Sequence, residues 1–339
     1  MMIGIERSIM KRILIYDVAA VSGGAKTILD QFYEQYRNQK NVQCYFIVSL
    51  LDYEENDFVH VIKLPWVKKS WLHRLYCDYI YMPKLIKSLE IDEVLSLQNI
   101  GIPGCPCFQS VYVHNAIPFS DVSFKLVEDP FLWIYQNVIG RLTYRSLKKV
   151  DSIIVQTDWM RDRISEKCDI SKSHIEVRRV FEPDIGSINR IESEEVSFFY
   201  PCTAVKFKNI DVIIQACMLL DTKLYDQFKV YLTIGKDDNE LSRKYFETIV
   251  SDDLPIYFIG HLSNDKMSEY YSKSILIFPS YLETVGLPIL EAQEYSSSII
   301  VSDCLYAHDS VGNYENVEYF NYDKPNELSE LMKSHICTV

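Results

Sequence analysis

Long apolar runs are missing from this 339-residue chain, and no stretch reaches the length that a membrane-spanning helix needs. The nine cysteines are an odd number and lie scattered, without the paired spacing of a disulfide framework. Cys105 and Cys107 form a single C-x-C pair, and because no second pair follows we expect no zinc site. These absences predict a protein without disulfides in a reducing, cytoplasmic environment.

Two ligand-binding motifs are also missing. The sequence has no D-x-D, the spacing with which many transferases hold a divalent cation that bridges donor phosphates. It has no G-x-G-x-x-G either, so an alternation of strands and helices need not mean a nicotinamide enzyme. We therefore expect neither a metal nor a cofactor.

Charge is unevenly distributed along the chain, whose net charge is −12. Residues 1–185 contain 23 basic and 23 acidic residues, whereas residues 186–339 contain 12 and 24. The sequence has no basic stripe, so we expect no nucleic-acid partner. The asymmetry predicts two domains with separate roles.

Short apolar segments alternate with helical segments in both halves, a pattern typical of buried parallel sheets. We therefore predict an α/β fold with two Rossmann-like domains that face each other across a cleft. The predicted domains are residues 1–183 and 184–325, with a linker that begins at Val180 and a C-terminal tail or helix at 326–339. Strands are expected at residues 12–16, 42–49, 93–97, 110–113, 152–156, 197–200, 229–234, 255–259, 274–278 and 298–301, and helices at 25–36 and 210–220.

The most informative segment is 278–292, which begins where a strand ends, at the sheet edge where ligands of such folds bind. Gly286 allows the backbone to approach a ligand closely, and Pro288 suits the first turn of a helix. That helix start would offer amides and a positive dipole end to a diphosphate. Glu283 and Glu291 could accept hydrogen bonds from sugar hydroxyls. Taken alone, each glutamate fits better with supporting the turn or lying on a solvated helix face.

The sequence P-S-Y-L-E-T-V-G-L-P-I-L-E-A, residues 279–292, resembles the E-x7-E signature of family 4 (group 1) retaining glycosyltransferases with the GT-B fold. Val285 is the one departure, at a position where that family usually has Phe. The resemblance implies that Glu291 binds the nucleotide ribose and that Glu283 binds hydroxyls of the transferred sugar. It also implies that the diphosphate and the sugar are held by the backbone amides of Thr284, Val285, Gly286 and Leu287.

A second part of the resemblance follows the segment F-F-Y-P at residues 198–201. Lys206 and Lys208 lie where the family has a loop whose Arg and Lys neutralise the leaving diphosphate. Lys208 matches the Lys, whereas Thr203 occupies the position of the Arg. A donor aimed at developing charge is commonly worth about 3 kcal/mol of barrier, so we expect Lys208 to be catalytic and Lys206 to supply the missing charge.

Three residues of the first half complete the predicted site. Gly23 and Gly24 resemble a G-G-A segment of the family and could bring helix amides to a phosphate or an acceptor, or simply begin a helix. His114 ends an expected strand at a position where the family often has a His that contacts the donor sugar. An isolated His is more often structural, yet we group His114 with Glu283 and Lys208 as catalytic.

The resemblance implies a transferase that moves a hexose or deoxyhexose from a nucleotide-diphosphate sugar to a growing glycan with retention of configuration and without metal. The expected acceptor is a lipid-linked polysaccharide such as O-antigen or capsule. Two alternatives remain open. One is a nucleotide-sugar epimerase or a phosphorylase of the same fold. The other is a non-catalytic sugar-nucleotide-binding partner, which the missing Arg leaves possible.

Cations alternate with aromatic residues in the segment 64–89, which contains Lys68, Lys69 and Arg74. This pattern is typical of a helix that rests on an anionic membrane surface. It is equally typical of a solvated helix with its aromatic side chains in the core. We expect a cytoplasmic protein that is peripheral to the inner face of the membrane.

Overall fold

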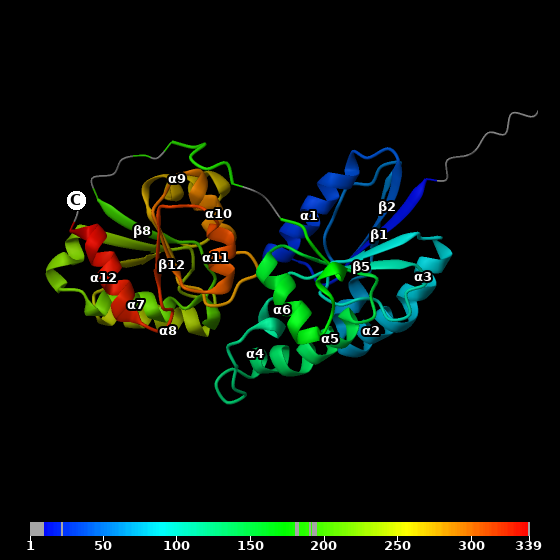
Figure 1. The fold of residues 1–339 in the computed structure, drawn as a ribbon, viewed down its shortest axis with the longest axis horizontal. Helices are drawn as coiled ribbons and strands as arrows, with labels where there is room; N and C mark the ends of the chain where they lie inside the picture. Colours follow the sequence, from blue (N-terminus) through cyan, green and yellow to red (C-terminus); the bar gives the residue numbers. More distant parts are fainter. Residues whose placement is uncertain (1–9, 22, 180–182, 190, 192–194, 338–339) are drawn as a thin grey trace, which may run out of the picture. The chain divides into compact units, whose positions relative to one another are not determined.

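The computed structural model describes residues 10–21, 23–179, 183–189, 191 and 195–337. The chain divides into two compact units, residues 1–178 and 179–339, each built on a parallel sheet (Figure 1). The division falls at Arg178, whereas the sequence placed it at residue 183. Part of the predicted linker lies outside the described residues. In the part that is described, the Gly186 amide donates to the Gln293 carbonyl at 3.1 Å, so this stretch lies along the second unit.

The described part of the first unit contains a seven-stranded parallel sheet in the order β3-β2-β1-β4-β5-β6-β7. Within it, Leu14 is aligned with Tyr45 of β2 on one side and with Val94 of β4 on the other. The strand order therefore reverses beside β1, and such a reversal opens a crevice at the carboxyl ends of the strands. The strands are β1 (Lys11–Asp17), β2 (Val42–Val48), β3 (Val59–Lys63), β4 (Glu93–Ser96), β5 (Phe108–Tyr112), β6 (Ser152–Val155) and β7 (Ile175–Val177).

Two long helices of the first unit each contain a π-helical turn. The turn η2 (Cys77–Tyr81) joins α2 (Trp71–Tyr76) to α3 (Met82–Ser88). The turn η4 (Tyr135–Ile139) joins α4 (Pro130–Ile134) to α5 (Gly140–Leu147). π-Turns of this kind occur frequently at functional sites. The other helical elements are α1 (Gly23–Arg37), α6 (Asp158–Cys168), η1 (Pro65–Lys69), η3 (Ile117–Phe119) and η5 (Lys172–His174).

The described part of the second unit contains a six-stranded parallel sheet in the order β10-β9-β8-β11-β12-β13, which reverses between β8 and β11. The strands are β8 (Val196–Tyr200), β9 (Phe228–Leu232), β10 (Ile256–Phe258), β11 (Ile275–Phe278), β12 (Ile299–Ser302) and β13 (Val317–Phe320). The helical elements are η6 (Lys206–Lys208), α7 (Ile210–Leu219), η7 (Thr222–Gln227), α8 (Glu240–Ser251), α9 (Asn264–Lys273), α10 (Leu287–Glu294), α11 (Leu305–Val311) and α12 (Pro325–Ile336). The last helix packs along α7, so it belongs to this unit.

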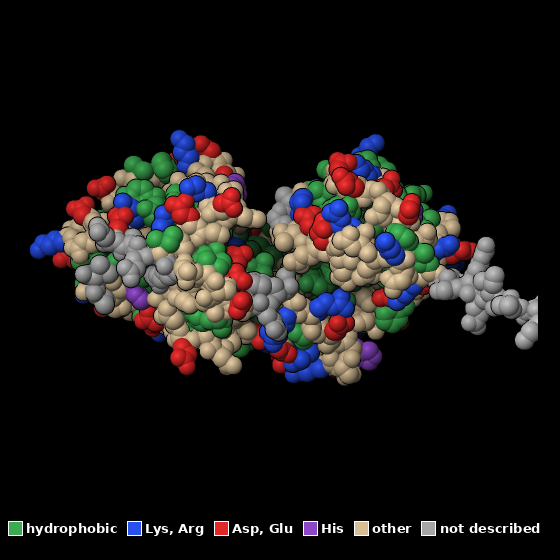
Figure 2. Space-filling view, turned by 90° about the horizontal axis from the view of Figure 1, so that it is seen from above, with side chains coloured by type: hydrophobic (Ala, Val, Ile, Leu, Met, Phe, Trp, Pro, Cys, Tyr) green, Lys and Arg blue, Asp and Glu red, His purple; other side chains and the backbone are tan. Residues whose placement is uncertain are grey.

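Burial explains why these segments form central strands. All five side chains of β8 and all four of β11 are buried, as expected for parallel strands covered by helices on both faces. The prediction of two parallel-sheet α/β domains is confirmed. On the face shown in Figure 2, acidic, basic and hydrophobic side chains are intermixed over each unit. Within the part of the chain that the structure describes, no helix combines the length and the apolar character needed to cross a bilayer.

Candidate functional site

In the second unit, the loops after β8 and β11 are tied to each other at the carboxyl ends of these adjacent strands. The Phe207 carbonyl accepts a hydrogen bond from the Ser280 hydroxyl at 3.0 Å. Asn209, with a left-handed φ of 57°, donates its side-chain amide to the carbonyls of Pro279 at 3.2 Å and Tyr322 at 2.8 Å. These bonds fix η6 against the segment that leads into α10.

This arrangement brings two of the predicted catalytic side chains together. Lys208 Nζ lies 2.5 Å from Glu283 Oε1, and the two side chains are only 17% and 16% exposed. The same ammonium lies 5.8 Å from the centre of the Phe278 ring, and the Tyr200 hydroxyl donates to the Lys208 carbonyl at 2.9 Å. A cation is thus held at the edge of the sheet where an anionic ligand would bind, with little solvent to screen it.

Gly286 precedes α10 in a left-handed conformation with φ of 77°. A Cβ atom there would lie 3.1 Å from Ile289 Cδ1, 3.2 Å from Tyr306 Cε2 and 3.3 Å from Phe278 Cε1. Both the backbone angle and these neighbours require glycine. The chain can therefore turn sharply from β11 into α10, whose first amides have no acceptor within the helix and carry the positive end of its dipole.

Glu291 lies in the second turn of α10 and points into the domain. Its Oε2 accepts a hydrogen bond from the buried Tyr271 hydroxyl at 2.5 Å. Burial raises the pKa of Glu291. This glutamate is therefore held in a polar contact inside the second unit, not on a solvated helix face.

The remaining predicted residues of the second unit lie on the same two loops. Lys206 begins η6 with an exposed side chain, and Thr203, at the position of the family's Arg, is also exposed. Thr284 and Val285 lie between Glu283 and α10, and Leu287 is the first residue of that helix. Among the described side chains, no group of three or more His, Cys, Asp or Glu converges as metal ligands would.

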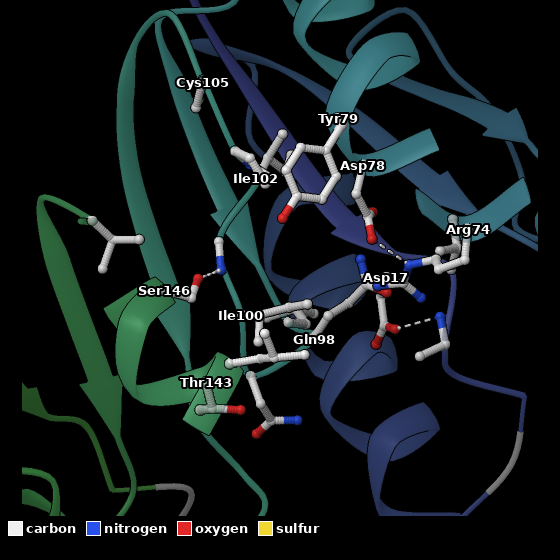
Figure 3. A pocket seen from close by; sticks show the side chains of 18 of the residues that line it. Asp17, Arg74, Asp78, Tyr79, Gln98, Ile100, Ile102, Cys105, Thr143 and Ser146 are labelled. Carbon is white, nitrogen blue, oxygen red and sulfur yellow. Dashed lines mark hydrogen bonds and ion pairs between the residues drawn. The ribbon is translucent and has the colours of Figure 1, made fainter. Parts of the chain in front are cut away.

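In the first unit, a cavity of about 1170 Å³ opens at the carboxyl ends of β1, β4 and β5 (Figure 3). It lies where the strand order reverses beside β1, and both π-helical turns line it. Figure 3 shows Asp17, Gln98 and Arg74 on one side, with Thr143 and Ser146 of α5 opposite. His114, which follows β5, lines the same cavity.

Several buried polar atoms of this cavity have unmet hydrogen-bonding capacity. Asp17 Oδ1 accepts from the amides of Ala19 at 3.1 Å and Ala20 at 2.9 Å, whereas its Oδ2 has no partner among the described residues. The same holds for both side-chain amide atoms of Gln98 and for His114 Nδ1. Because buried polar atoms are nearly always paired, these atoms are expected to meet a ligand or water. A carboxyl, an amide and an imidazole together suit a ligand with several hydroxyl groups.

Burial also sets the protonation of the two ionisable groups of this set. It raises the pKa of Asp17 to about 6 and lowers the pKa of His114 to about 4. His114 is therefore neutral near pH 7 and can offer one ring nitrogen as a donor or an acceptor. Its amide donates to Asn99 Oδ1 at 2.7 Å, which fixes the end of β5 against the loop after β4.

Two cations that the sequence suggested for a membrane surface line this cavity. Arg74 Nε lies 2.6 Å from Asp78 Oδ2, and the Tyr16 hydroxyl donates to the other oxygen of that carboxylate at 2.5 Å. Lys68 Nζ donates to the Ala19 carbonyl at 2.9 Å. The Arg74 guanidinium, 24% exposed, is therefore paired with a carboxylate, and its contact with lipid stays a prediction.

Gly23 and Gly24 form the first turn of α1, beside the cavity that Ala25 lines. A Cβ atom at Gly24 would have no described atom within 4 Å, so packing does not require glycine at this position. The structure thus places His114 and the start of α1 at one sheet edge in the first unit. Glu283, Lys208 and Glu291 lie in the second unit.

The sequence did not single out Asp17, Gln98 or Asn99 for the site. A signal was present, because each is a polar residue at or just after the end of an apolar strand. In a parallel sheet with a reversal of strand order, such positions meet in the ligand-binding crevice.

Comparison with known proteins agrees with this geometry. Residues 182–337 match the family described as glycosyl transferases, group 1. The O-antigen chain mannosyltransferase RfbU of Salmonella typhimurium is 22% identical over 231 residues, which cover 67% of this chain and 60% of RfbU. Overall, the chain spans between 29 and 60% of the length of the curated relatives that it matches.

Two solved structures share the fold across both units. WaaG, a glycosyltransferase involved in lipopolysaccharide biosynthesis, aligns with a TM-score of 0.69 and 13% identity over 96% of this chain and 90% of WaaG. HepE from Anabaena, in complex with UDP-glucose, aligns with a TM-score of 0.67 and 13% identity over 96% of this chain and 89% of HepE. These likenesses show a GT-B fold of two parallel-sheet domains. Residues 182–337, slightly less than half of the chain, are thus similar to the group 1 glycosyltransferases.

Proposed function

We propose that this protein is a retaining glycosyltransferase that moves a hexose or deoxyhexose from a nucleotide-diphosphate sugar to a growing surface glycan. The observation that carries the proposal is the Lys208–Glu283 pair, held at 2.5 Å on the loops that the group 1 family model matches. The name of RfbU, an O-antigen chain mannosyltransferase, supports a bacterial surface polysaccharide as product. The UDP-glucose bound to HepE supports a nucleotide sugar as donor.

In the proposed reaction, the bond between the anomeric carbon and the phosphate oxygen breaks while an acceptor hydroxyl bonds to that carbon. Negative charge then develops on the departing diphosphate. Lys208 and the amides of residues 284–287 would bind it, because preorganised donors act most strongly where charge appears in the transition state. Glu283 would accept hydrogen bonds from hydroxyls of the sugar, and Glu291 from those of the ribose.

This assignment needs no divalent cation. One ammonium group and the positive end of α10 would supply the neutralising charge, with exposed Lys206 at the start of η6 supplying the charge of the absent Arg. Since Lys208 is paired with Glu283 in this structure, binding of a donor would redistribute its hydrogen bonds between the carboxylate and the diphosphate.

The cavity of the first unit would hold the acceptor. Asp17 and Gln98 present oxygen and nitrogen atoms that have no partner in the described part of the chain and that match the hydroxyls of a sugar. The hydroxyl that attacks must lose its proton, which would pass to an oxygen of the departing diphosphate. His114, with a pKa of about 4, is a weak base and would orient a hydroxyl as a neutral hydrogen-bond partner.

A thermal-shift panel of UDP, GDP and dTDP sugars tests the donor site, since a ligand at a hundred times its Kd stabilises a protein by about 2.7 kcal/mol. We expect one nucleotide class to stabilise the wild type and to stabilise Glu291→Gln less. Release of nucleoside diphosphate in the presence of acceptor should be unaffected by EDTA. Turnover without acceptor would favour an epimerase, and binding without turnover would favour a non-catalytic partner. No stabilisation by any nucleotide sugar would overturn the proposal.

A further inference from the structure

Residues 130–147 form one continuous helix with an apolar outward face. Phe131, Ile134, Val138 and Leu142 recur at helical spacing, and they are between 43 and 64% exposed. The loop before them adds Val127, which is 96% exposed. A soluble surface seldom leaves such a row uncovered, whereas a helix that lies in a membrane interface presents one. We call these residues the apolar row.

Within residues 130–150 the charged side chains are all basic, whereas Glu128 and Asp129 lie just before the helix. No acidic residue occurs from 130 to 150, although the chain has 47 acidic residues. The exposed residues Arg141, Arg145, Lys148 and Lys149 lie in the same stretch. A run that is basic and apolar within an acidic protein complements an anionic phospholipid surface, which attracts each nearby cation by about 1 kcal/mol.

A second uncovered apolar surface lies across the cavity. Trp71 and Leu72 of α2 and Tyr79 of η2 are all exposed. Both apolar surfaces border the cavity, because Trp71 and Tyr79 of this surface and Leu142 of the apolar row are among its lining residues. Figure 1 shows α2, α4 and α5 on the same side of the first unit's sheet. Two apolar rims thus flank a cavity whose polar lining includes Asp17 and Gln98.

We propose that the apolar row and α2 dock together on an anionic phospholipid bilayer, so that the cavity opens toward the lipid. A lipid-linked acceptor would then enter from the membrane, with its saccharide among the polar groups and its lipid between the rims. The acceptor part rests on the proposed function, whereas the docking itself does not. The sequence had assigned this contact to the segment 64–89 alone, without residues 130–147.

The test compares two triple variants. Phe131, Ile134 and Val138 do not line the cavity, and all three are replaced by Ser. In the matched control, Leu219, Phe246 and Val250 of the second unit, which are 37 to 61% exposed, are replaced by Ser. Binding is measured by co-sedimentation with vesicles of phosphatidylcholine alone and of equal parts phosphatidylcholine and phosphatidylglycerol.

Wild type and control should sediment with the anionic vesicles and be released by salt, because screening acts within about 10 Å at 0.1 M. The apolar-row variant should lose about tenfold or more of its vesicle partition, since its buried apolar area contributes to interfacial binding. Equal binding by all three proteins would overturn the proposal. So would a wild-type dimer, seen by light scattering, that the apolar-row variant abolishes without any change in vesicle binding.

Trp71 provides a second readout that places α2 at the bilayer. Phospholipids with brominated acyl chains should quench the tryptophan fluorescence of the wild type, and quenching should fall clearly in Trp71→Phe. Unchanged quenching in that variant would show that α2 does not touch lipid. Donor binding in the thermal-shift panel is measured on the same variants. If the wild type bound no nucleotide sugar, the proposed function would be refuted. If the apolar-row variant still bound a nucleotide sugar but no longer bound vesicles, the docking surface would be supported.

Discussion

The partly buried pair of Lys208 and Glu283 allows a structural role of the lysine to be separated from a catalytic one. Replacement of Lys208 by Met keeps an unbranched side chain of similar length, but removes the ammonium that lies 2.5 Å from Glu283 Oε1 and 5.8 Å from the centre of the Phe278 ring. The carboxylate, 16% exposed, is then left without its cation. Two losses are expected, one in stability and one in catalysis.

The two losses differ in size and in how they can be reversed. Leaving a buried polar group unpaired costs about 1–3 kcal/mol of folding free energy. Loss of a donor aimed at developing charge costs about 3 kcal/mol of barrier, or roughly a hundredfold in kcat. The double variant Lys208→Met/Glu283→Gln removes the orphaned charge as well. It should therefore recover most of the stability of the wild type but none of its activity.

Chemical denaturation measures the first loss, and release of nucleoside diphosphate at saturating donor measures the second. Lys206→Met serves as the control, because that side chain is exposed and its removal should leave stability nearly unchanged. Its effect on kcat shows how much of the missing Arg charge Lys206 supplies. If Lys208→Met retained kcat once corrected for its folded fraction, the catalytic assignment would be wrong. Recovery of activity in the double variant would refute it equally.

Three further predictions concern the remaining groups. Glu291→Gln should raise the donor KM about tenfold or more with a smaller change in kcat, because a hydrogen bond to a charged group contributes about 1.5–3 kcal/mol. An unchanged KM in steady-state kinetics would exclude the ribose contact. Gly286→Ala should destabilise the fold by about 2 kcal/mol or more in thermal unfolding, since the left-handed conformation alone costs about 1–2 kcal/mol. Gly24→Ala is the control and should not destabilise the fold, because the space around its Cβ is open. Folding lowers the pKa of His114 to about 4, so this group lowers the free energy of unfolding as pH drops below about 6.5. Folding raises the pKa of Asp17 to about 6, so this group lowers the free energy of unfolding as pH rises from about 4. In Asp17→Asn, the free energy of unfolding should therefore rise more steeply with pH between about pH 4 and 6.5 than in the wild type, and the extra rise should be at most about 3 kcal/mol. Denaturation at several pH values measures this slope, and an unchanged or opposite slope would contradict these pKa values.

The central strands could be predicted from the sequence, and so could the edge strand β10, whereas the other edge strands could not. β1, β8 and β11 are buried on both faces, so their sequences are continuous apolar runs that stand out from their surroundings. β3, β7 and β13 were missed. They lie at the ends of their sheets and mix exposed or half-buried residues with buried ones. An edge strand has fewer buried positions, so its composition differs less from that of a loop.

The predicted site residues of the second unit lie within two short segments, which is why a sequence can locate them. Gly286 and Glu291 follow one strand, and Lys208 follows the strand beside it. The cavity of the first unit is different, because Asp17, Arg74 and residues of α5 are far apart in sequence and meet only after the chain has folded. The pairing of Arg74 with Asp78, four residues later, shows how local charge can mislead. A cation that looks solvated in a basic segment is neutralised one helical turn away.

The second unit is acidic overall, yet its proposed ligand is an anionic diphosphate. The second half holds 12 basic and 24 acidic residues, so its overall field would repel a diphosphate. At about 0.1 M salt, however, exposed charges are screened beyond about 10 Å, whereas partly buried ones are screened much less. What decides binding is therefore the charge within a few ångströms of the ligand. Lys208, largely hidden from solvent, and the positive end of α10 supply that charge at the carboxyl edge of the sheet. Raising the salt concentration should therefore release the protein from anionic vesicles well before it weakens binding of a nucleotide sugar.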